Sequence, residues 1–206
     1  MRKEKSKSGS PSRAQDVVRP RDRIVASAQD LFHRHGIRGV GVEAIAEAAC
    51  TNKMTLYRHF DSKDELILEY LQHKGKKSEE IWADMERSNP GDPAGQLHRF
   101  VELAARFIVE DERGCDLANA AVELTEQGHP GLRVIEEFKS RQRERLSLLC
   151  TAAGASQPAL LADTLFLLIE GARVSRRSVG TNGPSANLLQ TSQGVLASFG
   201  VPAPKA

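Results

Sequence analysis

The ten residues Thr51–Phe60, "TNKMTLYRHF", decide the fold of this chain. They include a lysine, an arginine, a histidine, two threonines and a tyrosine, but no carboxylate. Leu56 and Phe60 stand four residues apart, so on a helix they share one face, and Asn52 is a favoured N-cap. We therefore expect a short helix over 53–60 with an apolar inner face. Its outer face carries donors without acids, which suits a surface that meets phosphates, because carboxylates there would repel them.

The flanking segments predict helices that would pack around this one. Apolar residues recur on one helical face over 21–35, and a second, shorter apolar pattern starts at Val42. After the quoted stretch, Ser62 and Glu65 have the spacing of a capping box and predict the start of a longer helix. Two short helices joined by a few residues beneath a longer first helix predict a helix-turn-helix unit. The second helix of such a unit enters the DNA major groove.

The rest of the chain also favours helix, so the predicted fold class is all-α. "NPGDP" (89–93) is a strong break. Beyond it we expect helices at about 94–111, 117–127, 130–152, 158–177 and 184–198, three of which begin near a proline, where a missing N–H costs nothing. No useful period-2 alternation is present. Residues 1–20 are rich in Lys, Arg, Ser and Pro and are expected to form a disordered basic arm.

Charge and cysteine content narrow the class of protein. Residues 1–60 carry 12 Lys/Arg against 6 Asp/Glu, a net of +6, whereas residues 61–206 carry 17 against 21, a net of −4. This asymmetry predicts a basic surface for a polyanion and a second region with another task. Three cysteines without paired spacing imply no disulfide framework. With no signal-peptide core and no long apolar run, we expect a cytoplasmic protein.

Residues 23–71 resemble the TetR family of transcriptional regulators. The resemblance rests on "ASAQDLFHRHGIRGVGVEAIAEAA" (26–49), "MTLYRHF" (54–60) and "SKDEL" (62–66). It implies a DNA-binding domain over 21–66 and a helical ligand-binding and dimerisation domain over 67–200. Two departures from the family pattern are Gly41, where threonine is frequent, and Cys50, in a turn that often holds glycine. By the resemblance, base edges are contacted by Lys53, Met54 and Arg58, and phosphates by Thr55, Tyr57, His59 and Lys63.

The resemblance also implies a ligand pocket, a homodimer and no cofactor. The expected function is a repressor released from an inverted-repeat operator by a small apolar or aromatic molecule. The expected pocket residues are Trp82, Met85, Phe107, Asn119, Glu123, Phe138, Phe166 and Glu170. The expected dimer contacts, on the two last helices, are Leu161, Leu165, Leu168, Ile169, Ala172, Leu188, Leu189 and Leu196.

Several alternatives stay open at this point. One alternative is that the outer face of 53–60 is only a solvated surface. Another is that Tyr57 is a core aromatic. His33 and His35 suggest a metal site, but positions i and i+2 point to different helix faces. Cys115 and Cys150 are candidates for a redox pair. Catalysis is disfavoured, because no triad order, phosphate loop or carboxylate pair is evident. The main rival is a constitutive or architectural DNA-binding protein without a ligand.

Overall fold

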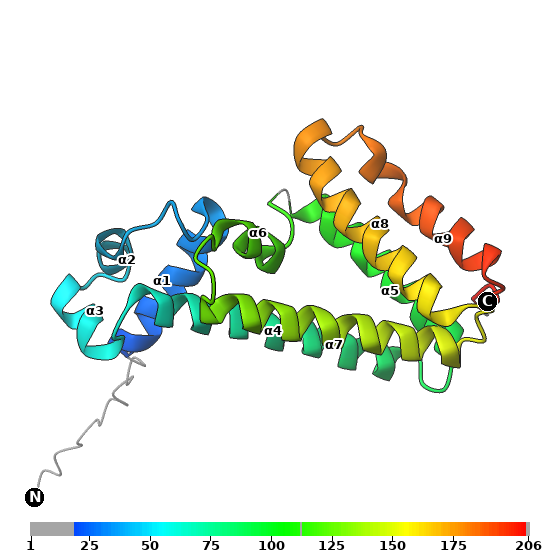
Figure 1. Cartoon of the computed structure of the whole chain (residues 1–206), viewed down its shortest axis with the longest axis horizontal. Helices are drawn as coiled ribbons and strands as arrows, with labels where there is room; N and C mark the ends of the chain where they lie inside the picture. The colour runs from blue at the N-terminus through cyan, green and yellow to red at the C-terminus, as the bar shows by residue number, and fades with distance from the viewer. Residues whose placement is uncertain (1–18, 112, 205–206) are drawn as a thin grey trace, which may run out of the picture.

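The computed structural model describes residues 19–111 and 113–204, and within these ranges every regular element is a helix. The molecule is elongated, with α1–α3 gathered at one end and α5, α8 and α9 at the other (Figure 1). No helix in the described ranges is long and apolar enough to cross a membrane. The elements are α1 (Pro20–His35), α2 (Val42–Ala48), α3 (Lys53–His59), α4 (Lys63–Ser88), α5 (Pro93–Glu110), α6 (Asp116–Glu123), α7 (Pro130–Ala152), α8 (Pro158–Val179), a 3₁₀ helix (Pro184–Asn187) and α9 (Leu188–Ser198).

Side-chain caps fix the two helix starts that follow the turn. The Asn52 side chain accepts the N–H of Thr55 at 2.9 Å and starts α3. At the start of α4, the Ser62 hydroxyl accepts the N–H of Glu65 at 3.2 Å. The Glu65 carboxylate accepts the N–H of Asp61 at 2.7 Å, one residue before the N-cap, instead of the N–H of Ser62 that a standard capping box would use. These caps satisfy backbone donors that a helix N-terminus leaves free.

Helix α4 is the link between the two ends of the molecule. It runs unbroken for 26 residues and lies beside α7 (Figure 1). Gly75 does not interrupt it, and a Cβ at this position would lie 3.4 Å from the Phe138 ring. The glycine therefore allows α7 to approach α4 closely. The expected division between residues 66 and 67 falls inside this helix, and the expected basic arm falls almost wholly outside the described residues.

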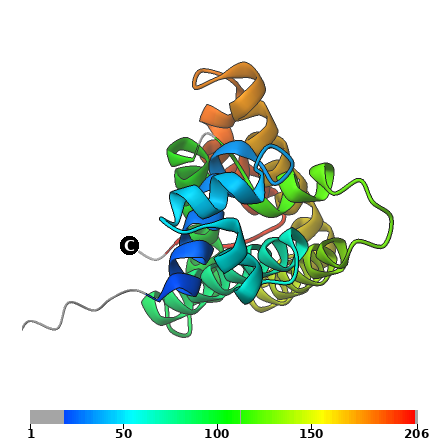
Figure 2. The same cartoon turned by 90° about the vertical axis from the view of Figure 1, so that its left-hand side faces the viewer.

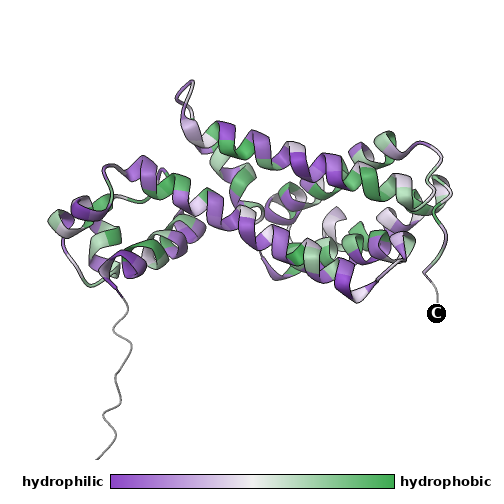
Figure 3. Cartoon of the chain, turned by 90° about the horizontal axis from the view of Figure 1, so that it is seen from below, coloured by the Kyte–Doolittle hydropathy of each residue, from purple (hydrophilic) through white to green (hydrophobic). Residues whose placement is uncertain are grey.

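Buried side chains form one main core at each end, and a smaller cluster, mostly of α5 and α8 side chains, lies beside the second of them. The core of the N-terminal end joins α1–α4 and continues into α6 and α7, through residues such as Leu117 and Phe138. Figure 2 views the molecule from this end. The core of the other end includes Leu97, Leu161 and Leu196. Apolar and polar residues alternate around the helices, as amphipathic packing requires (Figure 3).

Two predicted helix boundaries were wrong. The segment 184–198 is a 3₁₀ turn followed by α9, not a single α-helix. Helix α6 ends at Glu123, four residues before the expected 127. Both differences lie at helix ends, where local turn geometry rather than apolar periodicity sets the boundary.

Candidate functional site

Helix α3 presents its polar residues to solvent. Leu56 and Phe60 are 0% and 1% exposed and hold the helix on the core, as expected. On the opposite face Met54 is 69% exposed and Tyr57 is 43% exposed, so Tyr57 is not a core aromatic. Lys53, Arg58 and His59 are exposed as well, and the Arg58 guanidinium lies 3.8 Å from the Met54 sulfur.

The outer face of α3 has one acidic neighbour, and it comes from α2. Lys53 Nζ lies 2.5 Å from the Glu43 carboxylate. The hydrogen bond raises the pKa of Lys53 and lowers that of Glu43. This partner could not be seen in the sequence stretch itself, because it stands ten positions earlier. Lys63 and Thr55 are only partly exposed, and burial lowers the pKa of Lys63.

The turn between α2 and α3 is built on a non-glycine residue with a left-handed backbone. Cys50 has φ of 50°. Its N–H donates to Glu47 O at 3.0 Å, and the N–H of Thr51 donates to Ala46 O at 2.9 Å, which together make a Schellman motif. Cys50 thus occupies a position that favours glycine, in agreement with the family pattern, in which this turn often holds glycine. Gly41, the N-cap of α2, provides no side-chain cap.

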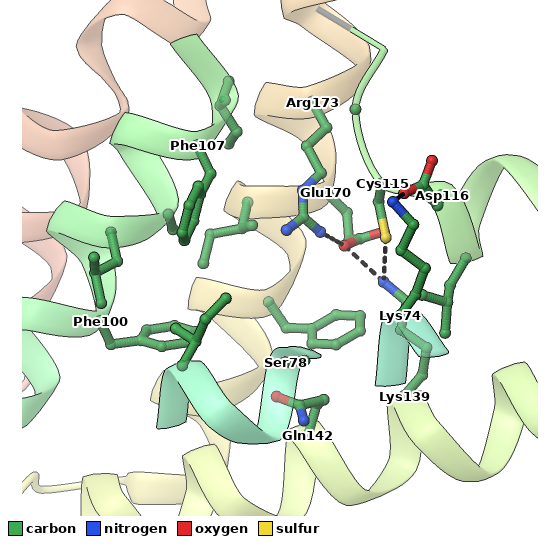
Figure 4. Close-up of a pocket in the computed structure, with 18 of the residues that line it drawn as sticks. Lys74, Ser78, Phe100, Phe107, Cys115, Asp116, Lys139, Gln142, Glu170 and Arg173 are labelled. Atoms are coloured by element: carbon green, nitrogen blue, oxygen red, sulfur yellow. Dashed lines mark hydrogen bonds and ion pairs between the residues drawn. The ribbon is translucent and has the colours of Figure 1, made fainter. Parts of the chain in front are cut away.

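A cavity of about 310 Å³ lies among α4, α5, α7 and α8 and reaches the start of α6. Figure 4 shows Phe100 and Phe107 on one side of it and a group of charged side chains on the other. Phe107 is 37% exposed, so this part of the wall meets solvent. Six of the residues expected in a pocket line it, namely Trp82, Met85, Phe107, Phe138, Phe166 and Glu170.

Asn119 and Glu123, which were also expected in a pocket, do not line this cavity but a second, much smaller one beside α1. Asn119 Nδ2 donates to the carbonyl of Arg113 at 2.9 Å. Glu123 accepts the N–H of Arg38 at 3.0 Å, across the boundary with the N-terminal end. A Cβ at Gly36 would lie 2.5 Å from the Glu123 carboxylate, so this contact is tight. Helical periodicity placed both residues on α6 but could not show which neighbour α6 faces.

Charged side chains cluster where α6, α7 and α8 meet the cavity. Lys139 Nζ lies 2.9 Å from Glu170 Oε1 and 3.6 Å from the Cys115 sulfur. Arg173 donates to the same Glu170 oxygen. On α4, Trp82 Nε1 donates to the side chain of Gln142. Apart from Glu170, the polar members were not predicted, because their spacing in the sequence gives no sign that they meet.

Asp116 connects the cavity wall to α1. It lines the cavity, and its carboxylate lies 2.6 Å from Lys74 Nζ and 2.7 Å from His33 Nδ1. Burial opposes ionisation of Asp116, but the hydrogen bonds from Lys74 and His33 outweigh it and hold its pKa below the ordinary value. Nearby, Arg113 donates to the carbonyl of Arg34 at 2.6 Å. The separation of 83 residues between His33 and Asp116 explains why the sequence alone did not reveal this contact.

His33 lies between two carboxylates, 2.7 Å from Asp116 and 3.8 Å from Asp111. Within residues 19–111 and 113–204, no group of three or more His, Cys, Asp or Glu side chains is placed to hold a metal ion. The cysteines Cys115 and Cys150 are both free. Cys150 is fully buried, and burial raises its pKa to about 11, so it stays a thiol at neutral pH.

Most residues expected in a dimer interface are covered within a single chain. A side chain already covered by its own chain has no surface left for a partner. Leu168 and Leu189 remain partly exposed. The covered ones, all at most 8% exposed, are Leu161, Leu165, Ile169, Ala172, Leu188 and Leu196.

A different face of α8 is apolar and uncovered. Leu160, Leu167 and Val174 are 52%, 71% and 69% exposed. They repeat every seven residues, which places them on one stripe of the helix. Gly171, on the same stripe, has nothing within 4 Å of the place where its Cβ would lie. The pattern of α8 contained two apolar stripes, and the sequence could not tell which of them faces the core.

The sequence and the fold both match known regulators. Residues 24–70 match the family described as bacterial regulatory proteins, tetR family. The repressor NicS of Pseudomonas putida is 27% identical over 147 residues, covering 70% of this chain and 66% of that protein. The repressor SCO4008 of Streptomyces coelicolor is 34% identical over 95 residues, covering 45% of this chain and 46% of that protein. The alignments thus span less than two thirds of these curated relatives.

A solved structure covers more of the chain. The crystal structure of SCO4454, a TetR-family transcriptional regulator from Streptomyces coelicolor, superposes with a TM-score of 0.75 at 28% identity. The match covers 87% of this chain and 95% of that chain, so it includes the C-terminal helices as well as α1–α3. Together with the match over residues 24–70, this likeness shows that the chain belongs to the TetR family of bacterial regulators.

Proposed function

We propose that this chain is a dimeric transcriptional repressor that binds an inverted-repeat DNA operator and releases it when a small apolar or aromatic molecule occupies the cavity. The observation that carries the DNA-binding part is the outer face of α3. Its exposed Lys53, Met54 and Arg58 stand on a helix whose Leu56 and Phe60 are buried. Such a helix is rigid enough to place side chains in a groove.

Each exposed residue of α3 suits a particular contact. The Arg58 guanidinium matches O6 and N7 of guanine, and the Met54 side chain suits a thymine methyl group. Lys53 is held by Glu43 in the free protein, so we expect DNA to compete with this carboxylate for the ammonium group. Lys63 stands in the first turn of α4, where backbone N–H groups add to its attraction for a phosphate.

Dimerisation is expected because of the small size of one recognition helix. A single short recognition helix buries too little surface for specific affinity. Pairing of two chains through the exposed stripe of α8, with α9 beside it, would present two α3 helices to one duplex. A two-fold dimer reads two half-sites about one DNA turn or more apart, and its operator is therefore an inverted repeat.

Release requires that the effector bind two conformations unequally. Asp116 provides a route, because it lines the cavity and contacts both Lys74 on α4 and His33 on α1. An effector that displaces α6 or α4 would shift these contacts and change the distance between the two α3 helices of the dimer. A coupling free energy of about 1–3 kcal/mol would weaken DNA binding about 5- to 150-fold. The cavity favours this mechanism over a constitutive regulator without a ligand.

The test compares the affinities of two arginine-to-alanine variants for the DNA that the wild type binds. Arg58→Ala should cost about 1–3 kcal/mol on the cognate site and relax one base position in each half-site. Arg87→Ala is the matched control, since the Arg87 side chain is 69% exposed and lies in the last turn of α4, at the opposite end of this helix from α3. Fluorescence anisotropy with labelled duplexes measures both. Equal losses for the two variants, or an Arg58→Ala loss of the same size on random DNA, would contradict base reading by α3.

A further inference from the structure

We infer that the cavity takes an organic carboxylate: a molecule with an aromatic or branched apolar body and one anionic head group, bound by Arg173 and Lys139. The inference rests on the proposed function in so far as the cavity is the effector site. It goes further by assigning the charge of the ligand, which apolar lining alone leaves open.

Aromatic side chains on one side of the cavity favour an apolar body for the ligand. Trp82 and Phe100 stack there with their ring centroids 5.1 Å apart. Phe107 and Phe166 line the same space (Figure 4 labels Phe100 and Phe107). A volume of about 310 Å³ is at the lower end of the range for small-molecule sites, so a one- or two-ring body is the appropriate size.

The head group is set by the opposite side, where positive charge exceeds negative charge. Two cations, Lys139 and Arg173, share a single oxygen of Glu170. All three are partly buried, with side-chain exposures of 20%, 28% and 26%. One carboxylate cannot neutralise both cations, so this group carries one net positive charge. A second carboxylate supplied by a ligand would restore the balance.

The free hydrogen-bond donors of Arg173 also favour a carboxylate ligand. Only Nη1 of Arg173 is engaged among the described contacts, which leaves donors of the guanidinium free. A guanidinium binds a carboxylate through two parallel hydrogen bonds, and such charged bonds are stronger than neutral ones. The two other acids that line the cavity have partners of their own and do not compete for Arg173: Asp116 contacts Lys74 and His33, and Asp111 accepts the N–H of Arg113 and lies 3.8 Å from His33.

A cationic ligand is the alternative that the five aromatic side chains of the lining would suggest, because ring faces attract cations. Two observations oppose it. The Lys139 ammonium already lies 5.2 Å from the centroid of the Phe166 ring. The only acid of this group, Glu170, is already paired with two cations, so a third would meet net repulsion.

The test uses two sets of probes that share a body and differ in charge: phenylacetate, phenylacetamide and phenethylamine, and the naphthyl analogues of all three. Calorimetry with the full-length chain, without DNA, measures the binding of each. We expect the acid of at least one set to bind about tenfold or more tightly than its amide, and the amine to bind more weakly still.

Three variants test the charge assignment, and the first two should change the affinity for the acid in opposite directions. Arg173→Gln should weaken binding of the acid about tenfold or more. Glu170→Gln should strengthen it, because the competing carboxylate is gone. Arg177→Gln, an exposed position near the end of the same helix, should leave it unchanged. Thermal unfolding of each variant verifies that it is folded.

Several results would overturn the inference: preference for the amine, equal binding of acid and amide, weaker binding of the acid by Glu170→Gln, or no binding of any acid in either set. Failure of the proposed function would look different. An acid that binds as expected but leaves DNA affinity unchanged would support the carboxylate site and contradict its role in release.

Discussion

Val174→Glu should separate the dimer without unfolding the chain. Val174 lies on the uncovered stripe of α8 with Leu160 and Leu167 and is 69% exposed in a single chain. In the proposed two-fold dimer this surface is buried against the partner. Glutamate at this position would place a carboxylate in the interface, where an unpaired charge is costly.

The expected magnitude follows from the exposed fraction. Full burial of a valine side chain contributes about 1.5–3 kcal/mol, so covering the exposed 69% contributes about 1–2 kcal/mol. The residue occurs twice in a two-fold interface, which gives about 2–4 kcal/mol for the dimer. Loss of this term alone raises the dimer dissociation constant roughly 30- to 700-fold. Desolvation of the two carboxylates increases the effect.

Sedimentation equilibrium over a concentration series measures the dissociation constant, and circular dichroism verifies the helical fold. Val122→Glu on α6 is the matched control, because Val122 is 81% exposed and lies off the stripe. Leu165→Glu should instead unfold the chain, since Leu165 is 0% exposed. The reasoning about α8 is refuted if Val174→Glu and Val122→Glu have the same dissociation constant as the wild type.

Three further predictions concern the turn, the phosphate contact and Asp116. Cys50→Gly should raise the free energy of unfolding by about 0.5–1 kcal/mol, because relief of left-handed strain exceeds the added chain entropy; a decrease in urea unfolding experiments would contradict this. Lys63→Ala should weaken binding to all DNA sequences alike and flatten the dependence of affinity on salt; a changed base preference with an unchanged slope would show another role. The pKa of Asp116 is lowered by folding, so its ionised form stabilises the fold above its ordinary pKa, and this contribution is lost as the pH falls through the lowered value. The stability difference between wild type and Asp116→Asn should therefore shrink below about pH 4, and a difference that stays constant down to strongly acidic pH would exclude this linkage.

Local patterns in the sequence predicted the helices well, for physical reasons. Leu56 and Phe60 share a face by spacing alone, and both are buried. The Ser62 cap and the start of α7 at Pro130 depend on residues next to each other in the chain. For the turn at Cys50, only the family resemblance indicated a position that often holds glycine. These features depend on contacts within a few residues, which periodicity and turn chemistry describe directly.

Contacts between distant segments could not be predicted in the same way. Helix α8 has apolar residues on two stripes, and only packing shows that Leu165 faces the core while Leu167 faces outward. Glu123 was expected to line a pocket, but α6 turns it toward Arg38. The cluster of Lys139, Glu170 and Arg173 joins α7 and α8, and its net charge exists only in the folded chain.

The central claim is that two copies of α3 read DNA as a symmetric pair. The most direct measurement is selection of duplexes from a random-sequence pool by the purified full-length chain, followed by sequencing. We expect an inverted repeat whose half-site centres lie about one DNA turn or slightly more apart, with one position in each half-site relaxed when Arg58→Ala is used instead. A pool without enriched sequences, or an enriched motif that lacks two-fold symmetry, would contradict the account.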